Sequence, residues 1–239
     1  MTEADSSIAV PKNNGELSGS SLQIVKVEDR QARNTFIRLP WFLYRNDPMW
    51  VPPLLLERRM HLSPKNPYFE HATCCFWVAY RDGKPVGRIS EQIVQMHLER
   101  YKDSTGVFGM LESEDNSETF KALFDTAESW LRSQGMLCCR VPFNLSINQE
   151  YGLLVAGFDT PPSMMMGHAL PYYAGRIEEC GYSKEKDLLA YIVEGDVEPS
   201  PARRTIIKRA KGRIQARPLR KKHFQKDLDN IVSIFNKDW

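Results

Sequence analysis

The chain has 239 residues, enough for one large domain, and 42% of them are apolar, as expected for a protein with a packed core. Its net charge of +2 conceals an uneven distribution, because Ser200–Trp239 contains twelve basic and three acidic residues while the rest is net acidic. No apolar run has the length of a membrane span, and the acidic start lacks the basic and apolar regions of a signal peptide.

The first hundred residues predict a strand, two helices and a hairpin. Residues 1–21 are rich in Ser, Gly and Asn and are expected to form a disordered arm. Pro40 should kink or split the first helix, which Asp29 opens. The expected elements are a strand over 22–27, the helix after Asp29, a helix over 54–61, and a hairpin of 73–80 with 85–94 around Asp82-Gly83.

The stretch from Thr105 to Ser146 predicts the centre of the fold. A buried strand over 105–112 is followed by an amphipathic helix that Gly135 ends and by a second apolar strand over 136–143. A strand, a helix and a strand form a right-handed crossover, so the two strands should be parallel. The helix start fits a capping box of Asp115 with Glu118, with Asn116 and Ser117 as alternative caps.

The corner where this strand meets the helix, Leu111–Thr119, has the position of a phosphate site but the wrong charge. It contains four acidic residues and no glycine, lysine or arginine. Acidic side chains near a helix start bind its free amides and repel an incoming anion, each by about 1 kcal/mol even when solvated. An ordinary capped helix and a functional carboxylate cluster are both compatible with this corner.

The segment that follows has no clear period until a helix at Pro171–Cys180 and a strand at Asp187–Val193. Its three consecutive methionines, Met164–Met166, are typical of core filling. The chain's five cysteines include two adjacent pairs and no C-x-x-C spacing. Neighbours on a strand point to opposite faces, so we expect no metal site, and buried thiols in a reducing cytoplasm.

The basic C-terminal part repeats the pattern of the N-terminal part. A strand, a charged link, an amphipathic helix, Asn/Asp and Trp occur in Ile24–Trp50 and again in Ile214–Trp239. The second copy would begin with a strand at Ile214–Leu219 and continue with a helix at His223–Lys237. It is interpreted as the start of a second domain like the first.

The order of these elements, together with YYAGRIEECGY near Cys180, resembles the GNAT superfamily of acyl-CoA N-acyltransferases over about Leu22–Glu194. The segment PFNLSINQEYGLLVAGFDTPP resembles a bacterial group that joins two such units. The resemblance implies an α/β fold with a mixed, mostly antiparallel central sheet and helices on both faces. The implied organisation is an arm at 1–21, a GNAT-like domain at 22–195, a basic linker at 196–213, and a truncated second domain at 214–239 that continues beyond residue 239.

The resemblance also implies acetyl-CoA or another acyl-CoA as the donor, and a small-molecule or peptide amine as the acceptor. The family binds the CoA diphosphate with an Arg/Gln-x-x-Gly-x-Gly/Ala turn, which Ser113–Thr119 does not match. The family's general-acid tyrosine corresponds to Ile177, and the nearest tyrosines, Tyr172 and Tyr173, come earlier.

In this family an amine attacks the acyl thioester directly while a base takes its proton. The catalytic candidates are Glu112, at the end of the central strand, and Tyr173. Asn144 and Asn148 follow the next strand, where ligand contacts are common in such sheets, and are the candidates for substrate binding.

Two other readings remain open. A catalytically degenerate copy could act as the scaffold or regulatory half of a tandem protein, which the acidic corner and the missing tyrosine favour. Binding of nucleic acid or an acidic partner through Arg203–Lys222 is a third possibility, although this run lacks aromatic residues. A membrane partner is not expected.

Overall fold

The computed structural model describes residues 21–140, 142–146, 149–192, 198–213 and 217–238, in two compact units, Met1–Leu188 and Leu189–Trp239. The first unit is built on a five-stranded sheet with the order β1-β2-β3-β4-β5. Neighbouring strands are antiparallel except β4 and β5, which are parallel as predicted. The strands are β1 (Leu22–Lys26), β2 (Ala72–Arg81), β3 (Lys84–Val94), β4 (Thr105–Ser113) and β5 (Cys138–Arg140).

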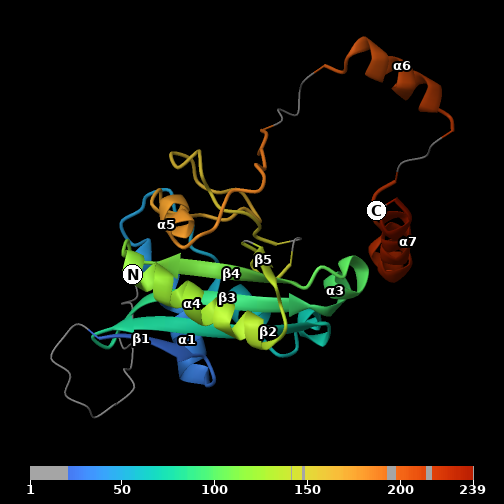
Figure 1. Ribbon diagram of the computed structural model, residues 1–239. Helices are drawn as coiled ribbons and strands as arrows, with labels where there is room; N and C mark the ends of the chain where they lie inside the picture. The colour runs from blue at the N-terminus through green and yellow to red at the C-terminus, as the bar shows by residue number, and fades with distance from the viewer. Residues whose placement is uncertain (1–20, 141, 147–148, 193–197, 214–216, 239) are drawn as a thin grey trace. The chain divides into compact units, whose positions relative to one another are not determined.

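Helices cover both faces of this sheet. Figure 1 shows α4 across one face and α1 across the other. This arrangement confirms the mixed, mostly antiparallel α/β fold that the sequence predicts. The helices of this unit are α1 (Arg30–Leu43), α2 (Leu55–His61), the short 3-10 helix η1 (Pro67–Glu70), α3 (Gln95–Tyr101), α4 (Ser117–Ser133) and α5 (Tyr173–Glu179).

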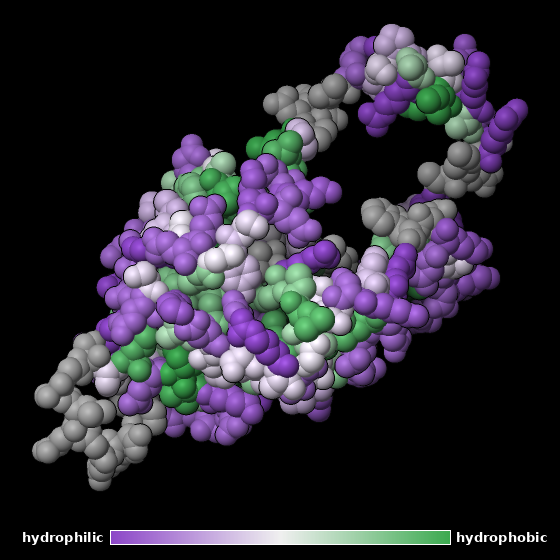
Figure 2. Space-filling view, viewed as in Figure 1, coloured by the Kyte–Doolittle hydropathy of each residue, from purple (hydrophilic) through white to green (hydrophobic). Residues whose placement is uncertain are grey.

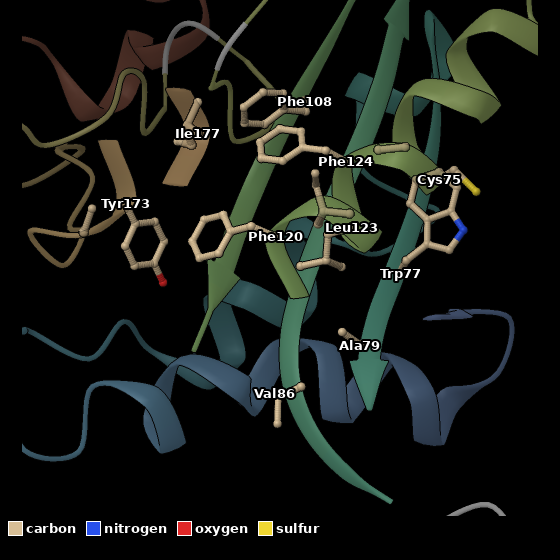
Figure 3. Packing of buried hydrophobic residues seen from close by; sticks show 13 residues of the cluster. Cys75, Trp77, Ala79, Val86, Phe108, Phe120, Leu123, Phe124, Tyr173 and Ile177 are labelled. Atoms are coloured by element: carbon tan, nitrogen blue, oxygen red, sulfur yellow. The ribbon is translucent and has the colours of Figure 1, made fainter. Parts of the chain in front are cut away.

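The alternation of side chains along β2 divides the core into two layers. Trp77 and Ala79 belong to the cluster under α4, and Val78 and Tyr80 belong to the cluster under α1. The α4 layer is aromatic, with Phe108 and Phe124 edge to face at 4.8 Å between ring centroids. Figure 3 shows these rings together with Tyr173 of α5. Burial of each large apolar side chain stabilises the fold by about 1.5–3 kcal/mol.

The structure corrects two details of the predicted helices, the effect of Pro40 on α1 and the cap of α4. Helix α1 is a single helix that runs through Pro40 without splitting. The cap of α4 is Asn116, whose Oδ1 accepts the amides of Glu118 and Thr119, whereas Asp115 pairs with Arg176. One of the alternative caps is therefore confirmed, and the Asp115 capping box is not formed.

Strands near the end of the first unit are shorter than predicted. β5 is only three residues long, and its first residue, Cys138, is exposed, as is Leu137 before it. The predictions that this strand is buried and that all five cysteines are buried are therefore wrong. The strand expected at 187–193 is absent over 187–192, because that backbone has no ladder partner among the described residues. Met164–Met166 are exposed and do not fill the core.

The surface of the α4 face, shown in Figure 2, is a mosaic in which small apolar patches alternate with hydrophilic side chains. Within the described ranges, every helix is too short or too polar to cross a bilayer. All five cysteines, whether buried or exposed, are free thiols.

The second unit contains α6 (Pro201–Ala210), the short 3-10 helix η2 (Lys221–His223) and α7 (Phe224–Asp238). Helix α6 lies within the predicted basic linker. No strand forms over 217–219; instead, Arg217 and Arg220 both pair with Asp227 and lower the pKa of that carboxyl. The apolar stripe of α7 is exposed, and the truncated second domain remains a prediction.

Glu91 of β3 is a buried carboxyl without a hydrogen-bond partner among the described residues. Its side chain is fully buried, and neither carboxylate oxygen is bonded. Burial, together with the negative charge of Glu128, raises the pKa of Glu91 well above its usual value. The folded chain therefore favours the protonated form of this side chain.

We expect Glu91→Gln to stabilise the fold relative to the parent chain increasingly as pH rises above the ordinary glutamate value of 4.5, and to change little near pH 4. Because the folded pKa is raised, the native state binds this proton more tightly than the unfolded state, and stability falls as pH rises toward the folded pKa. Urea unfolding across pH measures this, with Glu99→Gln on the exposed part of α3 as control. If the unfolding free energies of parent and variant change with pH in parallel, Glu91 is not the source of the pH dependence.

Candidate active site

Three side chains from distant parts of the chain converge at the end of β4. The carboxylate of Glu112 accepts a hydrogen bond from the Tyr173 hydroxyl at 3.0 Å and a second from the Tyr44 hydroxyl. Both tyrosines are buried, Tyr44 at the end of α1 and Tyr173 in the first turn of α5. The Glu112 side chain keeps 13% of its surface accessible.

Arg88 holds the other oxygen of Glu112, at 3.5 Å, from the neighbouring position on β3. The same guanidinium donates to the carbonyl of Phe36 at 2.7 Å and lies over the Phe36 ring. In an unbroken helix that carbonyl would accept the amide of residue 40, but Pro40 has no N–H. The proline therefore leaves an acceptor free inside α1, and Arg88 occupies it.

Burial sets the protonation behaviour of this cluster. It raises the pKa of Glu112 above its usual value, although the positive charge of Arg88 works in the opposite direction. Burial and the nearby Glu112 raise the pKa of Tyr44 and of Tyr173 well above 10, so both phenols remain protonated donors at neutral pH. A carboxylate with a raised pKa, fixed by two permanent donors, is suited to accept a proton from an amine.

A β-bulge lies two residues before Glu112. Met110 adopts a left-handed conformation with φ of 47°, and the β3–β4 register shifts beside it. The freed amide of Met110 donates to Oδ1 of Asn144 at 2.6 Å, and Nδ2 of Asn144 donates to Glu150 at 2.7 Å. The loop after β5 thus docks on the bulge and occupies its backbone donor.

Gly109 is required for this docking. A Cβ at this position would lie 1.6 Å from the carbonyl oxygen of Phe143, which cannot move without breaking its contacts with β4 and Gln92. We expect Gly109→Ala to lower the unfolding free energy by about 2–3 kcal/mol or more. Gly175→Ala, where the added methyl meets nothing within 4 Å, should be neutral or stabilising by up to about 1 kcal/mol. Equal urea midpoints for the two variants would contradict this.

The acidic corner before α4 is closed by internal ion pairs. Arg81 of β2 pairs with Glu114 at 3.1 Å and with Glu118 at 2.9 Å, and Arg176 of α5 pairs with Asp115 at 2.8 Å. Two amides of the first turn of α4 are taken by Asn116. A CoA diphosphate needs free amides and positive charge at this place, so the residues present do not fit it.

The structure brings some of the predicted site residues together and separates others. Glu112 and Tyr173 are in direct contact. Asn144 uses both of its side-chain polar atoms inside the protein, for Met110 and Glu150, which makes it a supporting residue in this geometry. Asn148 lies outside the described residues.

Sequence reasoning missed the residues that complete the cluster. Arg88 carried a usable signal, because it is the lone basic residue in the stretch VGRISEQIV. Tyr44 carried none, since it reaches Glu112 across 68 positions of sequence. His168 packs edge to face on the Tyr44 ring, and its Nε2 contacts Asp47 at 2.8 Å. These contacts help to hold the Tyr44 ring in place.

No model of a known protein family matches the chain. It is 45% identical to "Protein YghO" of Escherichia coli (strain K12) over 205 residues, which are 85% of this chain and 53% of that protein. It is 41% identical to the "Bacterial ceramide synthase" of Caulobacter vibrioides over 227 residues, 93% of this chain and 59% of that protein. The chain thus spans little more than half the length of these curated relatives.

Among solved structures, an aminoglycoside acetyltransferase from an uncultured soil metagenomic sample matches 72% of this chain and 95% of its own, with 14% identity and a TM-score of 0.41. The PaiA N-acetyltransferase of Thermoplasma acidophilum, in complex with coenzyme A, matches 54% and 84% respectively, with 16% identity and a TM-score of 0.33. The sheet order, the parallel β4–β5 pair and α4 between them follow the order of elements that the sequence resemblance implies. Glu112 lies one residue before the end of β4.

Proposed function

We propose that this chain provides the acyl-transfer centre of an N-acyltransferase, with Glu112 as general base and Tyr173 and Tyr44 as the donors that hold it. The observation that carries the proposal is the buried contact of Glu112 with both tyrosines at the end of β4. The GNAT-like order of elements supports this assignment, since that fold places its reacting groups at the same strand end.

The chemistry is one displacement at an activated acyl carbonyl. The amine nitrogen attacks the carbonyl carbon of an acyl thioester, a C–N bond forms, and the C–S bond breaks as the thiolate leaves. Glu112 accepts the proton that the nitrogen loses. The pKa of this carboxyl is raised, and a general base is most effective when its pKa is close to the pH at which it works. The leaving thiolate takes up a proton from solvent.

A long-chain amine is the proposed acceptor. One relative that shares 41% identity over most of this chain is named a bacterial ceramide synthase. A ceramide is the amide of a long-chain amino alcohol, so its synthesis requires acylation of a primary amine on an aliphatic chain. We extend that acceptor class to this chain as part of the proposal.

The donor follows from the closed corner before α4. An acyl-CoA is the donor that the GNAT resemblance implies, but the ion pairs of Arg81 and Arg176 leave no place for its diphosphate there. Binding energy from a remote part of a substrate improves the reaction only where the protein contacts that part. We therefore assign no role to a nucleotide and expect the acyl thioester itself to be recognised.

The experiment compares two donors that share one acyl group. The 239-residue chain is incubated with dodecylamine and either the acyl-CoA or the corresponding N-acetylcysteamine thioester, which lacks the nucleotide. We expect amide formation with both donors and kcat/KM values within about threefold of each other. A preference for acyl-CoA of more than a hundredfold would place a CoA site on this chain and contradict the closed corner.

A second candidate function is favoured by that same corner. A degenerate GNAT-like unit that scaffolds an active partner domain would also keep its fold and close its anion site. It predicts no amide with either donor and no effect of changes at Glu112. The nucleic-acid alternative predicts DNA binding by the basic second unit that weakens steeply as salt increases.

A further inference from the structure

The exposed side of helix α1 is basic. Every charged residue of Arg30–Leu43 is an arginine, and the residues on the solvent side recur at the helical spacing of three or four. Arg38 is exposed on this side, as are Arg30 at the start of the helix and Arg45 just beyond its end. Among the described residues, none of these three guanidinium groups pairs with a carboxylate. Arg45 instead donates to the Phe42 carbonyl and lies 4.4 Å from the centre of the Phe42 ring, and Phe42 is itself 43% exposed.

Helix α2 extends this basic surface. The Nη2 atom of Arg59 lies 3.4 Å from Oδ1 of Asn34, a residue on the exposed side of α1. Leu56 precedes Arg59 by one turn, so the two side chains are neighbours on α2, and Leu56 is 70% exposed. Glu57 lies two positions before Arg59 and therefore points to another side of the helix. We call the following set of exposed residues the α1–α2 face: Arg30, Arg38, Phe42, Arg45, Leu56 and Arg59.

The α1–α2 face keeps its positive charge, whereas the basic residues of α4 on the other side of the sheet are neutralised. Figure 1 shows α4 across that opposite face. On α4, Lys121 pairs with Asp125 at 2.8 Å and Arg132 pairs with Glu128, each four residues apart. The arginines of the α1–α2 face have no such carboxylate partner in the described ranges. They therefore favour an anionic partner, through an attraction that weakens as salt is added.

Exposed apolar side chains among these arginines favour a lipid bilayer as the anionic partner. Phe42 lies one turn beyond Arg38 on α1, and Leu56 lies beside Arg59 on α2, so apolar and basic groups alternate across the face. An anionic bilayer offers lipid phosphates to the guanidinium groups and an acyl region to the apolar side chains. A soluble polyanion offers the charge alone, which leaves the apolar side chains in water.

We propose that the α1–α2 face docks on an anionic lipid surface. The choice of lipid among anionic partners rests on the proposed function, because a long-chain amine partitions into a bilayer. Helix α1 connects the two, since its buried side ends at Tyr44, which donates to Glu112 in the candidate active site. The expectation of no membrane partner came from the lack of a run long enough to span a bilayer, and peripheral docking requires no such run.

Co-sedimentation of the 239-residue chain with phosphatidylcholine vesicles, with and without phosphatidylglycerol, tests the proposal. We expect binding to the anionic vesicles alone at about 0.1 M salt. The basic second unit also contributes to this attraction, so the decisive comparison is between variants. Arg38→Gln/Arg59→Gln should weaken vesicle binding about tenfold or more, since each basic side chain at an anionic surface contributes severalfold. Lys121→Gln/Arg132→Gln removes the same charge from α4 and should weaken it by less than about threefold.

The apolar contact is tested by Phe42→Ser/Leu56→Ser, which keeps every charge of the face. We expect vesicle binding to weaken about tenfold and binding of poly-glutamate, a soluble polyanion, to stay unchanged. Equal losses in the α1–α2 and α4 charge variants would overturn the proposal, because the second unit would then account for the binding. Vesicle binding that ignores Phe42→Ser/Leu56→Ser would also overturn it, in favour of a soluble acidic partner.

These measurements need no acyl donor, so they separate the docking face from the proposed function. Vesicle binding that follows the expectations, together with no amide formation from either donor, would refute the proposed function alone. Amide formation by a chain whose vesicle binding is insensitive to Arg38→Gln/Arg59→Gln would refute the docking face alone.

Discussion

Glu112→Gln is expected to lower kcat/KM for acylation of dodecylamine by about 10²–10⁴-fold, the usual contribution of a general base. The amide keeps the shape of the side chain and still accepts from Tyr44 and Tyr173, but it cannot take the proton of the attacking amine. The measurement is steady-state acyl transfer from an N-acetylcysteamine thioester by the parent and variant chains.

The same substitution removes the charge that Arg88 faces, so loss of activity must be separated from loss of fold. Glu112→Asp serves this purpose because it keeps the negative charge and withdraws the carboxylate by one methylene. We expect it to retain most of the stability of the parent and to lose much of the rate. Full activity in either variant would remove Glu112 from the reaction.

Arg88→Met is expected to lower the unfolding free energy by about 3–5 kcal/mol, the range for breaking a buried ion pair from one side. The substitution leaves Glu112 with an uncompensated charge and the Phe36 carbonyl without its donor. Urea unfolding at neutral pH measures the loss. Protonation of Glu112 should recover part of the lost stability as pH is lowered toward 5.

The double variant Arg88→Met/Glu112→Gln distinguishes an electrostatic cause from a packing cause. Removing both charges should restore part of the stability lost in Arg88→Met, so that the two effects are not additive. If the double variant is as unstable as the sum of the single changes, Arg88 contributes through packing on Phe36 and not through its charge.

Local patterns in the sequence were sufficient for β2 and for α4. The alternation in ATCCFWVAYR assigns Trp77 and Val78 to opposite faces, and the structure places them in the two core layers. The stripe of Phe120, Leu123 and Phe124 is fully buried under α4. These features depend on periodicity within one element, which sequence shows directly.

Features that depend on distant contacts could not be predicted. Pro40 reads as a helix breaker because sequence does not show that Arg88 would satisfy the carbonyl it frees. Residues 187–192 have the composition of a strand but lack a ladder partner among the described residues. Met164–Met166 were predicted to fill the core, although they are exposed, because composition alone does not show whether a methionine is buried.

The sequence identified some residues of the candidate site and not others. Glu112 and Tyr173 follow from their places at a strand end and at a helix start, and the structure brings them within 3.0 Å. Tyr44 could not be found this way, because it reaches Glu112 only through the packing of α1 against the sheet.

The pH dependence of kcat at saturating amine tests the central assignment of Glu112 most directly. Because burial raises its pKa, and because a base must be deprotonated to act, activity should fall on the acid side with an inflection above the ordinary glutamate value of 4.5. That inflection should be absent from the residual activity of Glu112→Gln. The same acid-side inflection in parent and variant would show that another group takes the proton.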